Sequence, residues 1–532
     1  MAEEMEIKLS PESVAGFLAL AMALFYFYLF ESVTLNAPIA FGDEGFHAGT
    51  PKRILETMEI PKYFEGTKIY SGAYFRPPLP HLVYAGVMMV FGTADFITKF
   101  LTPLFSLFTG ILLFLLAKRL HSKEAGLIAT FLYYSTPSMI TYNVLVYSEA
   151  PLVFFFVFFL YCFSRFLGGD GRKFILLSGT SAGFVALSKF TGLLVFPLMI
   201  ILFAFGSEKK NIKQFAVIFV IALLVGSASS IRQILSYGGI CQPRIPTDNK
   251  CYLGEAPANI EHDMGSFSGY VQQSGTNLSL IDIGVMNYIQ FGYTTAIFLL
   301  FAAGVIYGLL SRDRRIRSLS IGGVLLYGLL VYETINGRTE DSIRAVLLGV
   351  LPLIILAGLY FADLLKKLLV KHEKKIKTQL FASVAVFLVA FLALHGYSTS
   401  MDRANQMKTV KQFSPDYIDA CKWMDNNMPE GSYTINLWGA PCQFYAPKIN
   451  SVWTDLKELP DILFSQNDEK VIPLLERNGI NYIVVAKFSI SSSNVITSTP
   501  LDFVDYIGKS GRFSLVYENP ATLIYKLTYS HQ

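Results

Sequence analysis

Charged residues are scarce in this chain, at 16% of its 532 residues, whereas hydrophobic residues make up 52%. That balance argues against a water-soluble globular enzyme and is typical of a polytopic membrane protein. The net charge of +4 is small, so it gives no reason to expect nucleic acid as a partner. The sequence also lacks a glycine-rich phosphate loop after a strand, so no nucleotide pocket is predicted. No Ser/His/Asp arrangement stands out.

Cysteine is rare as well, with five residues in the chain. Cys241 and Cys251 share one polar loop, Cys421 and Cys442 share the tail, and Cys162 lies in a hydrophobic segment. The two local pairs could form disulfides on an external face, with four unrelated thiols as the alternative.

The hydrophobic segments predict about eleven transmembrane helices, since a span needs roughly 20 apolar residues. The first segment has an acidic leader and no small-residue cleavage site, so we expect it to remain as a span. Internal repeats are not apparent. The predicted spans are residues 14–33, 101–117, 124–142, 151–166, 174–187, 193–205, 215–235, 286–310, 319–331, 345–361 and 380–394.

Residues 79–91 follow a double proline and are too short to cross a bilayer, so we interpret them as a helix at the external interface. With this segment left out, the basic clusters after residues 117, 164, 208, 311 and 365 all fall on the cytoplasmic side. The first external loop does not follow this rule, because it holds five basic residues. Some of them could face anionic membrane lipid. They are Lys52, Arg53, Lys62, Lys68 and Arg76.

The composition divides the chain near residue 398. Residues 1–397 are predicted to form a transmembrane domain with external loops at 36–100 and 236–285. Residues 398–532 are polar and predict a small extracytoplasmic α/β domain, with helices at 415–427 and 469–478 and strands at 432–437 and 482–486. In the first of these helices, Tyr417, Cys421, Trp423 and Met424 are predicted to share one side.

The first external loop carries two unusual motifs. Asp43 and Glu44 stand in Phe41-Gly-Asp-Glu-Gly-Phe-His47, just past the first span, where adjacent acids are costly unless they serve a site. Arg76 stands in Tyr74-Phe-Arg-Pro-Pro-Leu-Pro80. The order of a span, an acidic pair, an Arg-Pro-Pro turn and a short hydrophobic helix resembles the first loop of the GT-C glycosyltransferases. The likeness is strongest to the protein O-mannosyltransferases and the lipid A aminoarabinose transferases. The resemblance implies a GT-C type α-helical membrane fold and an enzyme that takes a sugar from a polyprenyl-phosphate carrier.

Such a transfer needs a base for the acceptor hydroxyl and cations or donors for the departing phosphate. We expect Asp43 to be the base and Glu44 to position the acceptor or the sugar. The structural alternative is that Asp43 caps a short helix that starts at Gly45. Arg76 matches the basic residue before Pro-Pro-Leu in the resembling families and is expected to contact phosphate or sugar, with a plain solvated turn as its alternative.

Three further residues are predicted to bind substrate by the same resemblance. Glu149 in Tyr147-Ser-Glu-Ala-Pro151 matches an acid at the external start of a span. Its alternative is helix-start chemistry, with Ser148 as the cap. Lys189 matches a lysine after the fifth helix, although lysines at helix ends commonly extend to the interface. Arg344 matches an Arg-Tyr pattern in which Ala345 here replaces the aromatic residue.

A metal site has weak support. His47, His81, His262, Glu255, Glu261 and Asp263 all fall in predicted external segments, but no spacing approaches a zinc pattern, so a solvated surface is the favoured interpretation. A divalent cation is left open.

The sequence therefore predicts an inverting glycosyltransferase in the membrane that moves a single sugar (mannose or another hexose or pentose) from a dolichyl- or polyprenyl-phosphate donor. Its acceptor would be an extracytoplasmic glycan, protein or lipid. En bloc glycan transfer is disfavoured, because the tail lacks the Trp-Trp-Asp-Tyr-Gly signature of oligosaccharyltransferases. A transporter or lipid flippase is the main rival, and a non-catalytic scaffold is a third interpretation.

Overall fold

The computed structural model describes residues 11–34, 39, 44–61, 76–207, 211–237, 295–335, 342–370, 414–437, 439–452, 458–491 and 499–528. The chain divides into two compact units. The helical unit comprises residues 1–36, 99–228 and 277–409, and the mixed unit comprises residues 37–98, 229–276 and 410–532. Both units are discontinuous in sequence. The boundary near residue 398 stays a prediction.

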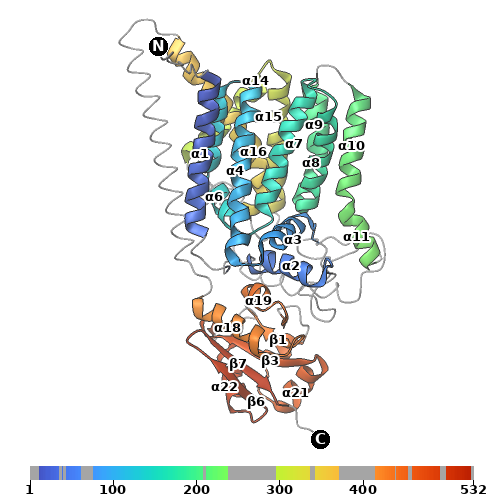
Figure 1. Cartoon of the computed structure of the whole chain (residues 1–532), viewed down its shortest axis with the longest axis vertical. Helices are drawn as coiled ribbons and strands as arrows, with labels where there is room; N and C mark the ends of the chain where they lie inside the picture. The colour runs from blue at the N-terminus through green and yellow to red at the C-terminus, as the bar shows by residue number, and fades with distance from the viewer. Residues whose placement is uncertain are drawn as a thin grey trace, which may run out of the picture. The chain divides into compact units, whose positions relative to one another are not determined.

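The helical unit is a bundle (Figure 1). Among the described residues, six helical segments that start in this unit or pass through it are long and apolar enough to cross a membrane. The described parts of the predicted spans are helical, although some spans are divided between two helices. Residues 286–294 and 380–394 lie outside the described residues, so the total of eleven stays a prediction. The helices are α1 (Pro11–Thr34), α4 (Asp95–Leu120), α5 (Lys123–Ser135), α6 (Pro137–Val144), α7 (Glu149–Leu167), α8 (Lys173–Ser188), α9 (Val195–Gly206), α10 (Ile212–Gly226), α14 (Thr295–Leu310), α15 (Arg314–Ile335) and α16 (Ser342–Val370). The next helix after α10 is α11 (Ala228–Tyr237), which belongs to the mixed unit from Ser229 onward.

The predicted span at 124–142 is divided into α5 and α6. Thr136, between them, has an extended backbone (φ −84°, ψ 116°) and precedes Pro137. The proline ring disfavours a helical conformation for the residue before it, so the first helix ends there and a new one starts at the proline.

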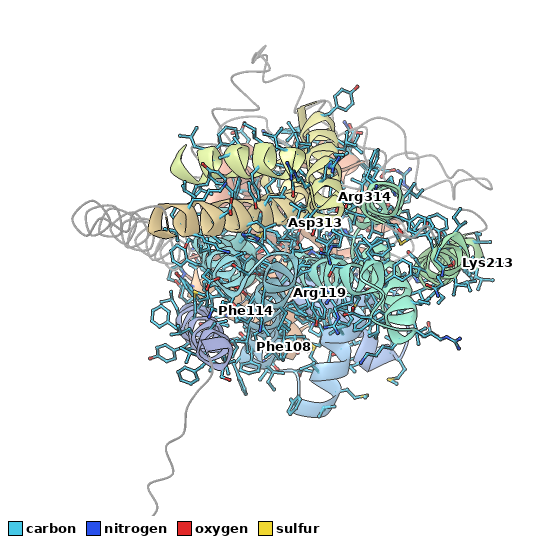
Figure 2. All side chains as sticks on the ribbon, turned by 90° about the horizontal axis from the view of Figure 1, so that it is seen from above. Phe108, Phe114, Arg119, Lys213, Asp313 and Arg314 are labelled. Atoms are coloured by element: carbon cyan, nitrogen blue, oxygen red, sulfur yellow. A yellow bond between two sulfur atoms is a disulfide. The ribbon has the colours of Figure 1, made fainter. Side chains whose placement is uncertain are left out.

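Basic side chains gather at one end of the bundle. Asp170, between α7 and α8, accepts from Arg119 of α4 at 2.9 Å and also pairs with Arg165 of α7. Figure 2 looks onto this end and shows Arg119, Lys213, Asp313 and Arg314 on different helices and turns. Helix α7 begins at Glu149, at the opposite end of the bundle. Arg119, Arg165, Lys213 and Arg314, which come from four of the predicted basic clusters, thus lie at one end of the bundle. The assignment of this end to the cytoplasm stays a prediction.

The mixed unit joins two helices of the first loop to the tail. These are α2 (Glu44–Thr57) and α3 (Leu79–Phe91), and α3 has the bounds that the sequence predicts. The tail holds α18 (Pro415–Asn427), β1 (Tyr433–Asn436), α19 (Ala440–Tyr445), β2 (Asn450–Val452), α20 (Leu459–Leu463), α21 (Asp468–Arg477), β3 (Ile480–Ala486), β4 (Ile490–Ser491), β5 (Thr499–Pro500), α22 (Leu501–Lys509), β6 (Phe513–Glu518) and β7 (Thr522–Leu527).

A five-stranded sheet with the order β2-β1-β3-β7-β6 organises the tail. β1 runs parallel to β2 and β3, whereas β7 is antiparallel to both β3 and β6. Side chains alternate across β3: Ile483 and Val485 pack with α20, α21 and α22, whereas Tyr482 and Val484 pack with α18. The sheet therefore has an apolar core on each face, as a strand buried on both sides requires.

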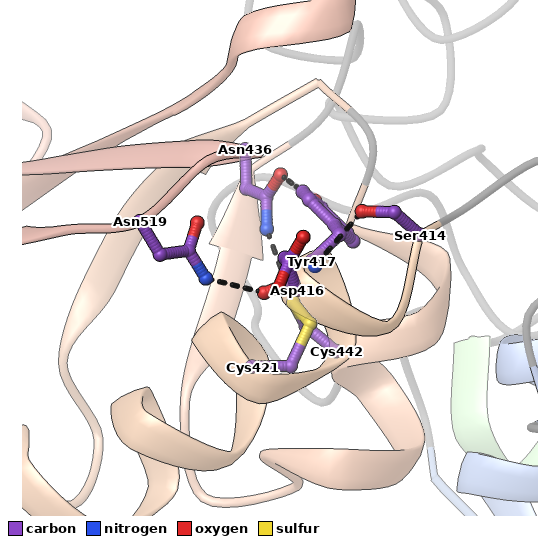
Figure 3. Close-up of a disulfide and its surroundings, with 7 residues drawn as sticks. All are labelled: Ser414, Asp416, Tyr417, Cys421, Asn436, Cys442 and Asn519. Atoms are coloured by element: carbon purple, nitrogen blue, oxygen red, sulfur yellow. Dashed lines mark hydrogen bonds between the residues drawn. A yellow bond between two sulfur atoms is a disulfide. The ribbon is translucent and has the colours of Figure 1, made fainter.

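Helix α18 has the predicted bounds and the predicted buried side. Ser414 accepts the backbone N–H of Tyr417 and so caps the helix, and Pro415 occupies its first turn. Tyr417, Cys421 and Met424 are buried against the sheet. The Tyr417 hydroxyl donates to Asn436 of β1 at 2.8 Å (Figure 3).

A disulfide joins Cys421 of α18 to Cys442 of α19, with 4.9 Å between their Cα atoms (Figure 3). This confirms one of the two predicted pairs; Cys241 and Cys251 lie outside the described residues. Cys162 is a buried free thiol in α7.

We expect the double substitution Cys421→Ala/Cys442→Ala to lower the stability of the tail by about 3 kcal/mol, because the bond closes a loop of 21 residues. Thermal unfolding followed by tail-specific proteolysis measures the change. The matched control is Cys162→Ala, which keeps the disulfide, so a reductant should lower the thermal stability of its tail as much as in wild type. The double variant has no disulfide to reduce. An equal loss of tail stability on reduction in both variants would contradict the prediction.

Candidate functional site

The acidic motif of the first loop lies at the start of α2. The helix begins at Glu44, one residue before the position predicted from the capping alternative, and Glu44 is buried. Asp43 lies outside the described residues. Arg76, directly before the double proline, places its guanidinium over the ring of Phe46 at 4.7 Å. The two motifs of the loop, about thirty residues apart in sequence, are therefore adjacent in the structure.

His47 and His81 form a buried pair between α2 and α3. Nδ1 of His47 lies 2.9 Å from Nε2 of His81, and the rings stack with centroids 5.1 Å apart. The interpretation of these two histidines as solvated surface is wrong, because both side chains are buried. Burial, helped by the nearby charge of Arg76, lowers the pKa of His81 to about 3. His81 is therefore neutral at physiological pH, and the guanidinium of Arg76 keeps its positive charge beside it.

Helix α2 also packs closely on α19 of the tail. A Cβ atom at Gly49 would lie 2.6 Å from the carbonyl oxygen of Gln443, so the approach needs glycine. Nζ of Lys52 donates to the carbonyl of Phe444 at 3.1 Å. Lys52 is one of the loop cations considered for contact with anionic lipid, and here it satisfies a carbonyl near the end of α19.

Two predicted site residues of the helical unit meet each other. Nζ of Lys189 lies 2.6 Å from Oε1 of Glu149, and the Glu149 side chain is fully buried. Ser148 donates to the other carboxylate oxygen at 3.3 Å. A buried carboxylate needs such partners, because its desolvation is otherwise very costly.

The backbone around each residue explains the pair. Ser148 makes no side-chain capping bond, so the capping alternative for this position is wrong; Pro151 does occupy the first turn of α7. Lys189 follows α8 in an extended conformation (φ −160°), before a short 3-10 helix at Phe190–Leu194. A Cβ at Gly192 would lie 2.0 Å from the carbonyl oxygen of Val185, so glycine is required for the chain to turn there.

A group of buried polar side chains lies between α4, α5 and α6, and sequence reasoning missed it. The Tyr133 hydroxyl bonds Asn143 at 2.9 Å and Ser106 at 3.4 Å, and Tyr134 bonds the carbonyl of Ser106 at 3.0 Å. The run of polar residues around Pro137 could have indicated this buried polar group, although the segment that contains it is otherwise typical of a single span.

The remaining predictions for the site are open. Arg344 lies in the first turn of α16, but its side chain is outside the description. Within the described residues there is no group of three or more His, Cys, Asp or Glu side chains placed to hold a metal ion. Glu44 and Arg76 belong to the mixed unit, whereas Glu149 and Lys189 belong to the helical unit. That they serve one pocket stays a prediction.

Comparison with known proteins agrees with this architecture. Residues 75–231 match a family model described as dolichyl-phosphate-mannose-protein mannosyltransferase. An uncharacterized protein of Aquifex aeolicus is 25% identical over 210 residues, which cover 38% of this chain and 40% of that protein. The chain thus spans well under half the length of the curated relative that it matches.

Solved structures are similar over much longer stretches. ArnT from Cupriavidus metallidurans, bound to undecaprenyl phosphate, has a TM-score of 0.63 at 12% identity, with 97% of this chain and 98% of that chain covered. The oligosaccharyltransferase of Archaeoglobus fulgidus has a TM-score of 0.62 at 13% identity, covering 91% and 70%. The arabinofuranosyltransferase AftD from Mycobacteria has a TM-score of 0.60 at 15% identity, covering 96% and 41%.

These likenesses establish the fold, and the candidate spans make the chain an integral membrane protein. The predicted resemblance is confirmed: the chain has the fold of the GT-C superfamily of membrane glycosyltransferases.

Proposed function

We propose that this chain is an inverting glycosyltransferase that transfers a single sugar from a polyprenyl- or dolichyl-phosphate donor to an extracytoplasmic glycan, protein or lipid. The sugar would be mannose or another hexose or pentose. The observation that carries the proposal is the family match over residues 75–231, which begins at the Arg-Pro-Pro turn and includes Arg76, Glu149 and Lys189.

Two features support a lipid-linked donor and a single sugar. One similar structure contains undecaprenyl phosphate, and it is matched over nearly the full length of both chains. The oligosaccharyltransferase is longer, with 70% of its chain covered, and its Trp-Trp-Asp-Tyr-Gly signature is missing from this sequence. The missing signature therefore favours the simpler transfer.

In this proposal the charges of the site have separate tasks. Asp43 takes the proton from the acceptor hydroxyl while that oxygen attacks the anomeric carbon, and Glu44 positions the acceptor or the sugar. The bond between the anomeric carbon and the phosphate oxygen breaks, and the charge that develops on the phosphate is stabilised by Arg76, Lys189 and Arg344. Arg76 suits this role because a guanidinium can bind phosphate through two parallel hydrogen bonds.

Purified protein in liposomes with radiolabelled polyprenyl-phosphate sugars tests the activity. Dolichyl and undecaprenyl carriers, each with several sugars, are incubated with a membrane extract as the source of acceptor. Release of the carrier phosphate and labelling of an acceptor are the expected results. Repetition with a chelator tests for a divalent cation. If no donor is consumed while labelled lipid crosses the liposome membrane, the flippase interpretation replaces this one.

We expect Asp43→Asn to lower kcat at least ~100-fold, because an amide cannot accept the proton from the acceptor hydroxyl. The measurement is acceptor labelling at saturating donor, with membrane insertion verified by protease protection. Glu59→Gln is the matched control, since Glu59 is an exposed acid of the same loop. Full activity of purified Asp43→Asn would rule out Asp43 as the base.

A single and a double variant separate the structural role of Lys189 from a role in binding the carrier. Lys189→Met leaves the buried carboxylate of Glu149 without its ammonium and should destabilise the helical unit by about 3–5 kcal/mol. The double variant Glu149→Gln/Lys189→Met removes both charges and should recover most of this stability.

The activity of the double variant decides the role. We expect it to stay at least ~10-fold below wild type in kcat/KM for the donor, because the cation beside the phosphate is gone even though the fold is restored. Thermal unfolding and donor titration on the same samples measure the two effects. If stability and activity recover together, Lys189 only pairs with Glu149.

A further inference from the structure

Tyr445 is the last residue of α19, which belongs to the tail in sequence but packs against α2 of the first loop (Figure 1). Its hydroxyl contacts two other segments of the mixed unit. It donates to a carboxylate oxygen of Asp95, the first residue of α4, and it accepts the backbone N–H of Ile39 at 3.1 Å. One side chain of the tail thus links the residues on both sides of the first loop.

Ile39 and Glu44 are five positions apart, and the acidic motif begins between them. Tyr445 holds Ile39, whereas neighbouring residues of α19 hold α2 itself. Gly49 lies against the carbonyl of Gln443, and Lys52 donates to the carbonyl of Phe444. Three successive residues of α19, from Gln443 to Tyr445, therefore each contact a different residue of the loop.

The electrostatics agree with a fixed donor. Burial, and then the carboxylate of Asp95, raise the pKa of the Tyr445 hydroxyl well above its usual value; the charge of Glu44 acts in the same direction. The hydroxyl is therefore protonated at any working pH and remains a donor to Asp95.

We propose that Tyr445 is a positioning residue for the acidic start of α2, so that the tail domain sets where Glu44 stands for the reaction. This inference rests on the proposed function, in which Glu44 positions the acceptor or the sugar. Without the hydroxyl, Ile39 and Asp95 lose their common partner and the start of α2 can shift. A shift of that kind lowers the rate of the chemical step more than it lowers donor binding.

The test compares Tyr445→Phe with Tyr506→Phe. Tyr506 of α22 also donates to an aspartate of the tail, Asp468, at 2.5 Å, but on the face of the sheet opposite α18. Both variants remove one tyrosine–aspartate hydrogen bond from the same unit. We expect kcat to fall ~10-fold or more in Tyr445→Phe with KM for the donor changed by less than about twofold, and both to stay near wild type in Tyr506→Phe.

Amide hydrogen exchange gives a readout that does not depend on activity. The Ile39 amide should exchange at least ~10-fold faster in Tyr445→Phe and at the wild-type rate in Tyr506→Phe. The exchange rate of the Ile39 amide should stay closer to wild type in Asp95→Asn than in Asp95→Ala, because the amide oxygen of asparagine can still accept from the tyrosine.

Each outcome is decisive. Equal kcat in the two tyrosine variants, or unchanged exchange at Ile39, overturns the inference, as does a parallel loss of activity and thermal stability in both variants. If wild-type protein consumes no donor, the proposed function fails, and with it the catalytic part of the inference. The exchange data still decide whether Tyr445 holds the segment.

Discussion

A carboxylate can be buried at the start of α7 only because an ammonium from the end of α8 reaches it. Glu149 and Lys189 are 40 residues apart in sequence and 2.6 Å apart at their charged atoms. In an apolar environment either charge alone would be far more costly than the pair. This contact joins the start of α7 to the residue after α8 at one end of the bundle. At the other end, Asp170 of the α7–α8 turn pairs with Arg119 of α4 and Arg165 of α7. Between these ends, α7 presents a nearly continuous apolar sequence.

In the mixed unit, too, a few polar contacts hold a helix in place. A short loop helix such as α2 has little apolar surface of its own, and Pro51 interrupts its hydrogen-bond pattern. It is stabilised by the tail, through a glycine that permits close approach and through side chains that satisfy backbone groups of α19. The disulfide ties α19 in turn to α18. The loop and the tail therefore depend on each other, although about 320 residues separate them in sequence.

Much of the local structure could be predicted from the sequence. Helices α3 and α18 have their predicted bounds because each has a strong start signal in proline or serine followed by an apolar pattern. The proximity of Arg76 to α2 followed from the resemblance. The mixed unit could not be predicted, since hydropathy detects a loop but not its distant partner. Nor could the burial of His47 and His81: a histidine in a polar loop looks solvated until the helices that enclose it are known. The position of Ser148 suggested a cap, but its hydroxyl turns to the carboxylate of Glu149.

The neutral imidazole of His81 beside Arg76 has a consequence for any anion that binds there. A histidine that gained a proton in weak acid would add a second positive charge and tighten such binding as the medium acidified. His81 does not titrate in that range, because its pKa is about 3. His81 therefore adds no charge there between mildly acidic and neutral surroundings, whereas the charge of the Arg76 guanidinium is constant.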